Sequence, residues 1–329
     1  MRIEGKHFLV TGGSGFIGSA LVRALVNGGA RVRSLDDDSR GSGRRLADLG
    51  ARVELMTGDI RDPAVVSAAM RGVDCVCHLA YVNGTEFFYS KPELVLEVAV
   101  KGMMNVLDAC REHGVKDLVL ASSSEVYQTP PRVPTDESVP LAVPDPLNPR
   151  YSYGGGKIIC ELLTVNYGRK YFDRAVIFRP HNVYGPDMGW EHVIPQLARK
   201  IADAGAGRSA PDQVVPVPIQ GDGSETRAFV FIDDFIDGLL RVIERGEHLG
   251  IYHIGTDAEV PIAKLAEEIA AALGVRVSLQ PGKLQPGGTP RRCPDITKVR
   301  ALGYQPRTPL SEGVGKTARW YAAHKRLST

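Results

Sequence analysis

A glycine-rich turn near the start of the chain constrains its fold more than any other feature. The segment TGGSGFIG follows an apolar run and precedes a helical pattern over Ser19–Asn27, and its glycines Gly12, Gly15 and Gly18 fall three apart. In a strand–turn–helix unit the first glycine permits the tight turn, the second admits a pyrophosphate and the third lets the helix pack on the strand. The free N–H groups at the helix start favour phosphate there. The sequence therefore predicts a dinucleotide-binding unit.

An acidic residue follows the next strand at the spacing that such a unit requires. The apolar run Ala30–Leu35 ends in Asp36, eighteen residues after Gly18. A carboxylate at this point binds the ribose hydroxyls of adenosine, which favours NAD over NADP. The alternative is that Asp36 belongs to a solvated acidic loop. We expect NAD as the cofactor.

Composition excludes several classes of function. The 329 residues carry a net charge of +2, which gives no indication of a nucleic-acid partner or an anionic membrane surface. No apolar run is long enough to span a bilayer, and no signal-peptide core is present at the start. The five cysteines are scattered without zinc-ligand spacing, so we expect buried thiols, no metal site and a cytoplasmic location. Cys75 and Cys77 alternate in an apolar run, which places both on one face of a strand.

The first half of the chain alternates short apolar strands with helical patterns. This alternation predicts an α/β fold, a Rossmann-like doubly wound parallel sheet. The expected strands are Phe8–Val10, Val32–Leu35, Val53–Met56, Cys75–Leu79, Leu118–Ala121 and Ala175–Phe178. The expected helices are Ser19–Asn27, Pro63–Met70, Glu93–His113 and Tyr153–Tyr171.

The second half has a mixed pattern, which predicts a smaller mixed α/β C-terminal substrate-binding domain. Gln128–Pro149 is rich in proline and is expected to form a loop over the site, and Ala204–Pro218 is expected to be loop-like. We expect strands at Phe229–Ile232 and Ile251–Ile254, and a helix at Ile262–Leu273. The predicted cofactor domain comprises residues 1–180 with about 226–255, and the substrate domain comprises 181–225 and 256–329.

Three residues have the types and spacing of a hydride-transfer site. Ser123 follows the strand Leu118–Ala121, and Tyr153 and Lys157 stand four apart on one predicted helix, so they share a face. A lysine ammonium beside a phenol is expected to lower the tyrosine pKa toward neutrality. Tyr153 could then take the proton of a sugar hydroxyl while hydride leaves its carbon for NAD, with Ser123 holding the same oxygen. The alternative is an ordinary helix surface.

These motifs, in this order, resemble those of the extended short-chain dehydrogenase/reductases, specifically the NAD-dependent nucleotide-sugar epimerase/dehydratase family. The resemblance covers nearly the whole chain. It rests on the glycine turn, Gly58–Asp62, His78–Ala80, the serine run, Tyr153 with Lys157, and Arg179–Pro186. It implies cofactor contacts at Gly12, Gly15, Phe16, Ile17, Asp36, Asp59, Ile60, Leu79, Ala80, Tyr153 and Lys157.

The C-terminal half resembles the segments with which this family binds a nucleotide-sugar substrate. Arg227 and Arg292 would each supply a planar guanidinium suited to diphosphate oxygens, whereas the alternative for both is an exposed surface arginine. The resemblance implies further substrate contacts at Ser124, Asn182, His192 and Val193. It also suggests a homodimer paired through the helices Glu93–His113 and Tyr153–Tyr171.

Glu125 bears on the reaction outcome. It stands where family dehydratases and decarboxylases place a glutamate, and Glu191–Pro195 resembles a dehydratase segment. The sequence thus favours oxidation at C4 of a nucleotide-linked hexose followed by 4,6-dehydration, with Glu125 as the extra base. The alternatives are a C4-epimerase, a decarboxylase like those acting on UDP-glucuronate, a reductase of a small carbonyl compound and a non-catalytic NAD-binding scaffold. A loop acid bonded to backbone is the alternative role for Glu125.

The chain also departs from the family pattern around the expected cofactor site. The family usually has Asn and Thr where this sequence has Ala99 and Met103, and it usually has Ala where this sequence has Tyr81. We expect Tyr81 to enter the nicotinamide or substrate pocket.

Overall fold

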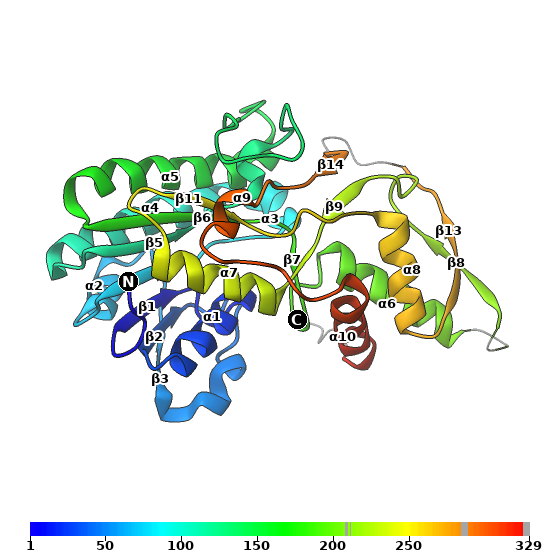
Figure 1. Ribbon diagram of the computed structural model, residues 1–329, viewed down its shortest axis with the longest axis horizontal. Helices are drawn as coiled ribbons and strands as arrows, with labels where there is room; N and C mark the ends of the chain where they lie inside the picture. The colour runs from blue at the N-terminus through cyan, green and yellow to red at the C-terminus, as the bar shows by residue number, and fades with distance from the viewer. Residues whose placement is uncertain (208–209, 211, 284–288, 325–329) are drawn as a thin grey trace.

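A parallel sheet forms the centre of the larger half of the molecule (Figure 1). The computed structural model describes residues 1–207, 210, 212–283 and 289–324. In this part of the chain seven strands pair in the order β11-β6-β5-β4-β1-β2-β3, and every pair is parallel. The strands are β1 His7–Thr11, β2 Arg31–Asp36, β3 Val53–Thr57, β4 Cys75–His78, β5 Asp117–Ala121, β6 Arg174–Pro180 and β11 Ile251–Ile254.

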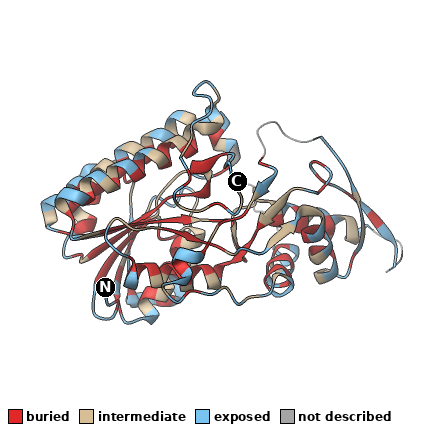
Figure 2. Ribbon diagram, turned by 45° about the horizontal axis from the view of Figure 1, so that its top comes forward, coloured by how far each residue is buried: buried red, intermediate tan, exposed pale blue. Residues whose placement is uncertain are grey.

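Helices cover both faces of this sheet, as the doubly wound prediction requires. On one face lie α1 (Phe16–Asn27) and α7 (Ile232–Arg245), which share a core with the side chains of Phe8 and Val10. On the other face lie α2 Pro63–Met70, α4 Pro92–His113 and α5 Ser152–Tyr171. The burial colouring shows the sheet as a mostly buried layer between these helices (Figure 2). The predicted fold class is confirmed.

Local sequence explains where these helices begin and end. Pro63 opens α2, and the preceding Asp62 side chain accepts hydrogen bonds from the amides of Ala64 and Val65, which caps the helix. Helix α4 ends at Gly114, whose φ of 70° is left-handed and whose amide donates to the Cys110 carbonyl. The helix boundaries expected from sequence hold to within a few residues.

A smaller group of elements forms the other end of the molecule. Helices α6 (Val193–Ala206), α8 (Ile262–Ala272) and α10 (Leu310–Ala323) pack together beside the strand pair β8 Val214–Pro218 and β13 Arg276–Gln280. A further sheet joins β12 Glu259–Pro261, β9 Thr226–Ala228 and β14 Arg291–Arg292, and β7 Val183–Tyr184 pairs with β10 Val230–Phe231. Short elements complete the described chain: η1 Gly43–Arg52, α3 Thr85–Ser90, η2 Ser124–Tyr127, η3 Pro149–Tyr151 and α9 Thr297–Arg300.

Two expectations for this half need correction, and one of them lies partly outside the described residues. Ala204–Pro218 is not a continuous loop, because α6 continues to Ala206 and β8 begins at Val214; residues 208, 209 and 211 lie outside the description. The strand expected over Phe229–Ile232 is shorter, since Ile232 starts α7. Alternate β8 side chains are buried, with 0% exposure at Val217, so tertiary packing made a strand of a Pro-containing segment.

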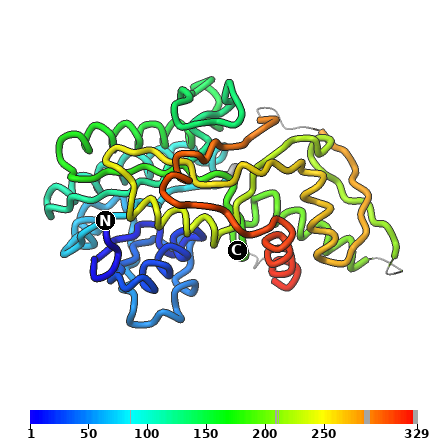
Figure 3. The backbone as a smooth tube through the Cα atoms, in the orientation of Figure 1, coloured from blue at the N-terminus to red at the C-terminus, as the bar shows by residue number. Residues whose placement is uncertain are grey.

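The chain returns from the smaller half to the large sheet before leaving it again. Figure 3 shows the yellow segment, which contains α7 and β11, running back beside the blue and green elements. Strand β11 pairs with β6 at the sheet edge. Helix α7 and β11 thus lie with the large sheet, whereas β9 pairs with β12 and β14 in the smaller half; the proposed boundaries of the cofactor domain, which include about 226–255, stay a prediction. In the described residues no helix has the length and apolar character needed to cross a bilayer.

Cys75 and Cys77 lie on the same face of β4, as predicted. Both side chains contact the core on the α1 side of the sheet, whereas Val76 between them contacts the core on the α4 side. All the cysteines are buried free thiols.

Candidate active site

The glycine turn has the geometry that its sequence predicts. Gly12 has a φ of 72°, and a Cβ there would lie 2.7 Å from the Ala80 amide nitrogen. At Gly18 a Cβ would lie 1.9 Å from the Gly12 carbonyl oxygen, so a side chain would push α1 off β1. Gly15 is the N-cap of α1, which leaves the first backbone amides of the helix facing the turn. The turn therefore presents a phosphate-binding surface without obstruction.

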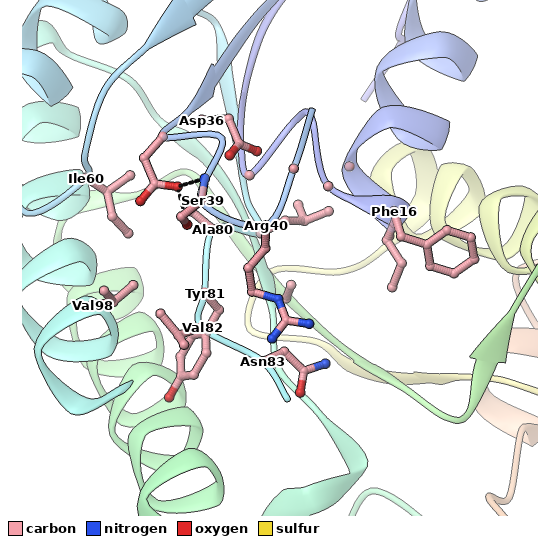
Figure 4. Close-up of a pocket in the computed structure, with 18 of the residues that line it drawn as sticks. Phe16, Asp36, Ser39, Arg40, Ile60, Ala80, Tyr81, Val82, Asn83 and Val98 are labelled. Carbon is pink, nitrogen blue, oxygen red and sulfur yellow. Dashed lines mark hydrogen bonds between the residues drawn. The ribbon is translucent and has the colours of Figure 1, made fainter. Parts of the chain in front are cut away.

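A pocket opens at the carboxyl ends of the strands, beside this turn (Figure 4). Every residue predicted from sequence to contact the cofactor lines it. They are Gly12, Gly15, Phe16, Ile17, Asp36, Asp59, Ile60, Leu79, Ala80, Tyr153 and Lys157. The pocket thus runs from the acid at the end of β2, past the start of α1, to the tyrosine and lysine of α5. Its length and lining suit a dinucleotide.

Asp36 stands at the end of β2 with its carboxylate held by the backbone. The carboxylate accepts hydrogen bonds from the amides of Ser14 at 2.9 Å and Asp38 at 3.0 Å. Burial raises the pKa of Asp36, although these two bonds oppose the rise. Ser14 belongs to the glycine turn, so the acid expected to bind the adenosine ribose also fixes the turn expected to bind the phosphates.

Tyr153 and Ser123 meet at the far end of the pocket. The Ser123 side chain is near enough to Tyr153 to act on its pKa, and the Tyr153 ring stacks on Phe88 with centroids 4.8 Å apart. Burial raises the pKa of Tyr153 to about 12, although the neighbouring Ser123 side chain and the charge of Arg40 oppose the rise. The phenol is therefore protonated at neutral pH in this structure.

Lys157 lies one turn along α5 but does not bond to Tyr153. Its ammonium donates to the Ala121 carbonyl at 2.7 Å and lies 3.8 Å from the centroid of the Tyr81 ring. Burial lowers the pKa of Lys157 to about 8, while Cys160 and Glu161 oppose the fall. The expectation that Lys157 lowers the Tyr153 pKa toward neutrality is wrong for this structure, because the ammonium faces Ala121 and Tyr81.

Ser122 and Ser123, neighbours in the serine run, have different partners. Ser122 donates to the buried carboxylate of Glu161, which also forms an ion pair with Arg179 at 2.5 Å. Ser122 is thus committed to a structural network, whereas Ser123 faces Tyr153. This division agrees with the choice of Ser123 as the candidate catalytic serine.

The two arginines expected to bind diphosphate are neighbours, and one of them holds Glu125. Arg227 on β9 is paired in register with Arg292 on β14. Arg292 donates to the Glu125 carboxylate at 2.5 Å. Burial acts to raise the pKa of Glu125, but the charges of Arg292, Arg150 and Arg227 hold it below its ordinary value. Burial and the nearby Arg292 charge lower the pKa of Arg227 to about 10.

The other residues expected to contact substrate lie on separate elements, and His192 is the one among them that lines the pocket. His192 lines the pocket as the N-cap of α6, and Val193 is the first residue of that helix. Ser124 is buried at the start of η2. Asn182 has a φ of 42°, and its side-chain amide donates to the Ala228 carbonyl at 3.2 Å, next to Arg227.

Two arginines of the site were not predicted from the sequence. Arg40 extends from the loop after β2 across the pocket toward Asn83, and its guanidinium lies 3.6 Å from Glu191 (Figure 4). Its buried Nη1 has no hydrogen-bond partner among the described residues. Arg150 precedes α5, and its buried Nε also has no hydrogen-bond partner among the described residues. Neither residue belongs to a recognisable motif, so only the proximity of Arg40 to Asp36 in sequence could have drawn attention to it.

Comparison with known proteins agrees with this geometry. The chain is 33% identical over 346 residues to a dTDP-4-dehydro-6-deoxy-D-allose reductase of Streptomyces bikiniensis, with 99% of both chains covered. It is 32% identical to a UDP-glucose 4-epimerase of Mycolicibacterium smegmatis, with 95% of this chain and 97% of the relative covered. A dTDP-glucose 4,6-dehydratase from Streptomyces venezuelae, solved with NAD bound, superposes with a TM-score of 0.83 at 32% identity and 96% coverage of both chains.

The family model for the NAD dependent epimerase/dehydratase family matches residues 8–255. That range includes the glycine turn, Asp36, the serine run, Tyr153 and Lys157. The described residues contain no cluster of side chains able to hold a metal ion. The pocket fits NAD, the cofactor of this family, and the chain belongs to the NAD-dependent epimerase/dehydratase family.

Proposed function

We propose that this enzyme transfers a hydride between NAD and C4 of a nucleotide-linked hexose. The observation that carries the proposal is Tyr153, which lines the end of the dinucleotide pocket together with Lys157 and has the Ser123 side chain as a neighbour that acts on its pKa. A phenol and a hydroxyl placed together can hold one sugar oxygen and move its proton. Lys157 lines the same pocket from the same helix, where its charge is available to the cofactor ribose.

The chain's own residues would perform the proton transfer. When bound, NAD supplies the acceptor or donor of the hydride. In the reductive direction the Tyr153 phenol would give its proton to the C4 oxygen; in the oxidative direction Tyr153 must first have lost that proton, so that the phenolate takes the proton of the C4 hydroxyl, while Ser123 orients the oxygen. Because burial raises the pKa of Tyr153 to about 12, its resting form is the phenol, which is the form needed to donate a proton to a C4 ketone.

The arginines near Glu125 support a diphosphate-linked substrate. Arg150, Arg227 and Arg292 all act on the charge of Glu125, which in turn raises the pKa of Tyr153. A group of guanidiniums next to the proposed reaction centre suits the oxygens of a diphosphate. The named relatives act on dTDP- and UDP-sugars, which agrees with this substrate class. Asn182, Ser124, His192 and Val193 would complete the substrate site.

A 4,6-dehydratase is the second candidate, since Glu125 lies close enough to Tyr153 to raise its pKa. As the extra base, Glu125 would remove the proton at C5 after oxidation at C4. Its pairing with Arg292 weakens that role, because a carboxylate with a lowered pKa is a poorer proton acceptor. We therefore place C4 hydride transfer first and dehydration second, and we propose that a substrate phosphate competes with Glu125 for Arg292.

We also propose a homodimer formed through α4 and α5. These helices pack against each other and expose apolar side chains, with exposed fractions of 38% at Leu96, 39% at Ile159 and 57% at Leu162. Such side chains on one helix pair suit burial against a second copy.

The test of the proposed function is a panel of UDP-, GDP-, dTDP- and CDP-hexoses and their 4-keto forms, incubated with the enzyme and NAD or NADH. Product mass separates the outcomes: an epimer has unchanged mass, a dehydration product has lost water and a reduced ketone has gained two hydrogens. Turnover by Tyr153→Phe at the wild-type rate would remove Tyr153 from the mechanism. Failure of every nucleotide sugar to react would refute the proposal.

A further inference from the structure

Tyr81 occupies a space that two small residues of neighbouring helices leave open. It follows β4 and points toward α5 (Figure 4), where its hydroxyl donates to the Tyr153 carbonyl at 3.2 Å. A Cβ at Gly156 would lie only 2.2 Å from that hydroxyl and 3.0 Å from the Ala99 Cβ. The Tyr81 hydroxyl therefore has room against α5 because residue 156 is a glycine, and the Ala99 Cβ of α4 lies close to the same point.

The ring also covers the buried end of Lys157. The Lys157 residue is 4% exposed, and its ammonium lies 3.8 Å from the Tyr81 ring centroid while donating to the Ala121 carbonyl. A desolvated ammonium against an aromatic face is attracted to the negative face of the ring. Lys157 also lines the pocket, so a ligand there would lie beside an ammonium that already contacts the Ala121 carbonyl and the Tyr81 ring.

We propose that Tyr81 is a positioning residue for Lys157: its ring face keeps the ammonium charged and aimed at the cofactor ribose. This inference rests on the proposed role of Lys157 in cofactor binding. It gives the Tyr81 departure from the family pattern a function, because the alanine that is usual at this position has no ring face to offer the ammonium.

The titration of Lys157 can be distinguished from that of the groups around it, because their pKa values differ. His78 on β4 is neutral, since burial lowers its pKa to about 3, and burial raises the pKa of Tyr81 well above its ordinary value. On α5, burial raises the pKa of Cys160 to about 11, Glu161 is paired with Arg179, and the pKa of Tyr153 is about 12. Lys157, with its pKa near 8, is the member of this set that titrates just above neutral pH.

The experiment measures NADH affinity by fluorescence as a function of pH, using the full chain freed of bound nucleotide. Wild type is expected to bind NADH more weakly as pH rises through about 8, when Lys157 loses its proton. Tyr81→Leu removes the attraction for the charged form. It should move the midpoint about one pH unit lower, so that binding weakens about twofold at pH 7 and about tenfold at pH 9 relative to wild type. Tyr81→Phe keeps the ring and should retain the wild-type midpoint.

A second perturbation reaches the ring from the other helix. Gly156→Ala places a methyl group against the Tyr81 hydroxyl, so it should displace the ring and reproduce the effect of Tyr81→Leu, although alanine is the better helix former. Combining Gly156→Ala with Tyr81→Phe removes the clashing oxygen and should restore the midpoint. This rescue distinguishes positioning from a general loss of folding.

The outcomes separate the two proposals. Suppose that wild type shows a midpoint in its NADH affinity as pH rises, and that Tyr81→Leu and Gly156→Ala both leave this midpoint unchanged. That result would overturn the role of Tyr81 but not the role of Lys157. Absence of any midpoint in wild type, with Lys157→Met binding NADH as tightly as wild type, would overturn the role of Lys157 and the inference with it. C4 hydride transfer would then still be judged separately by product analysis.

Discussion

Replacing Glu125 by glutamine should make the enzyme bind nucleoside diphosphates more tightly. Arg292 donates to Glu125 at 2.5 Å, and the two side chains are only 13% and 25% exposed. A phosphate must therefore displace a charge-assisted bond that contributes about 1.5–3 kcal/mol. Glutamine keeps the shape and a weaker neutral bond, so we expect a net gain of about 1.4 kcal/mol, or roughly tenfold in Kd.

The assay is isothermal titration of UDP, dTDP and GDP into wild type and Glu125→Gln. Glu259→Gln is the matched control, because Glu259 pairs at 2.5 Å with Arg291, the residue before Arg292, but Arg291 is 54% exposed. The control should leave the affinity of each nucleotide unchanged. Weaker or unchanged binding by Glu125→Gln would refute the competition between Glu125 and phosphate.

The same variant distinguishes the two candidate reactions. If dehydration follows oxidation, Glu125→Gln should still oxidise the sugar at C4 but stall afterwards, so that a 4-keto intermediate and NADH accumulate. If the reaction ends with hydride transfer at C4, the variant should turn over without accumulating either species. Rapid quenching followed by mass spectrometry of the sugar separates these results.

Four further perturbations test other parts of the account. Tyr153→Phe should abolish hydride transfer but leave NAD bound, because the ring that stacks on Phe88 is kept; loss of bound NAD on gel filtration would contradict this. Wild type should prefer NAD to NADP, and Asp36→Asn should reduce that preference about tenfold in competitive binding; equal affinity of wild type for both would refute the assignment. Arg40→Ala should weaken NAD binding roughly tenfold in calorimetry, with unchanged affinity placing Arg40 outside the site. Leu162→Glu should convert a dimer to a monomer by light scattering, and a wild-type mass in that variant would contradict the proposed interface.

The sequence predicts most of the features that depend on residues close together in the chain. The central strands and the helices α1, α2, α4 and α5 follow from periodicity, and the glycine turn follows from backbone conformations open to Gly12 but costly for other residues. All of the expected cofactor residues line one pocket, since the carboxyl ends of parallel strands lie at one edge of the sheet.

Long-range pairing explains what the sequence did not predict. Glu125 and Arg292 are 167 residues apart, so nothing in either segment indicates that the expected base and the expected phosphate ligand would neutralise each other. The Lys157 ammonium likewise lies against the Tyr81 ring, whose hydroxyl has room because residue 156, far along the chain, is a glycine. Strand β8 forms because its alternate side chains are buried in the core. The prolines of this segment predict a loop, and the sequence does not show that this core is there to receive the side chains.

The most direct test of the account follows the hydrogen at C4. The enzyme would be mixed with NAD and a reactive nucleotide hexose that carries deuterium at C4, then quenched within a single turnover. We predict that deuterium appears in the reduced cofactor of wild type and that none appears with Tyr153→Phe. Product formation with the deuterium still on the sugar throughout, and with no labelled reduced cofactor at any time, would contradict hydride transfer at C4 as the function of this site.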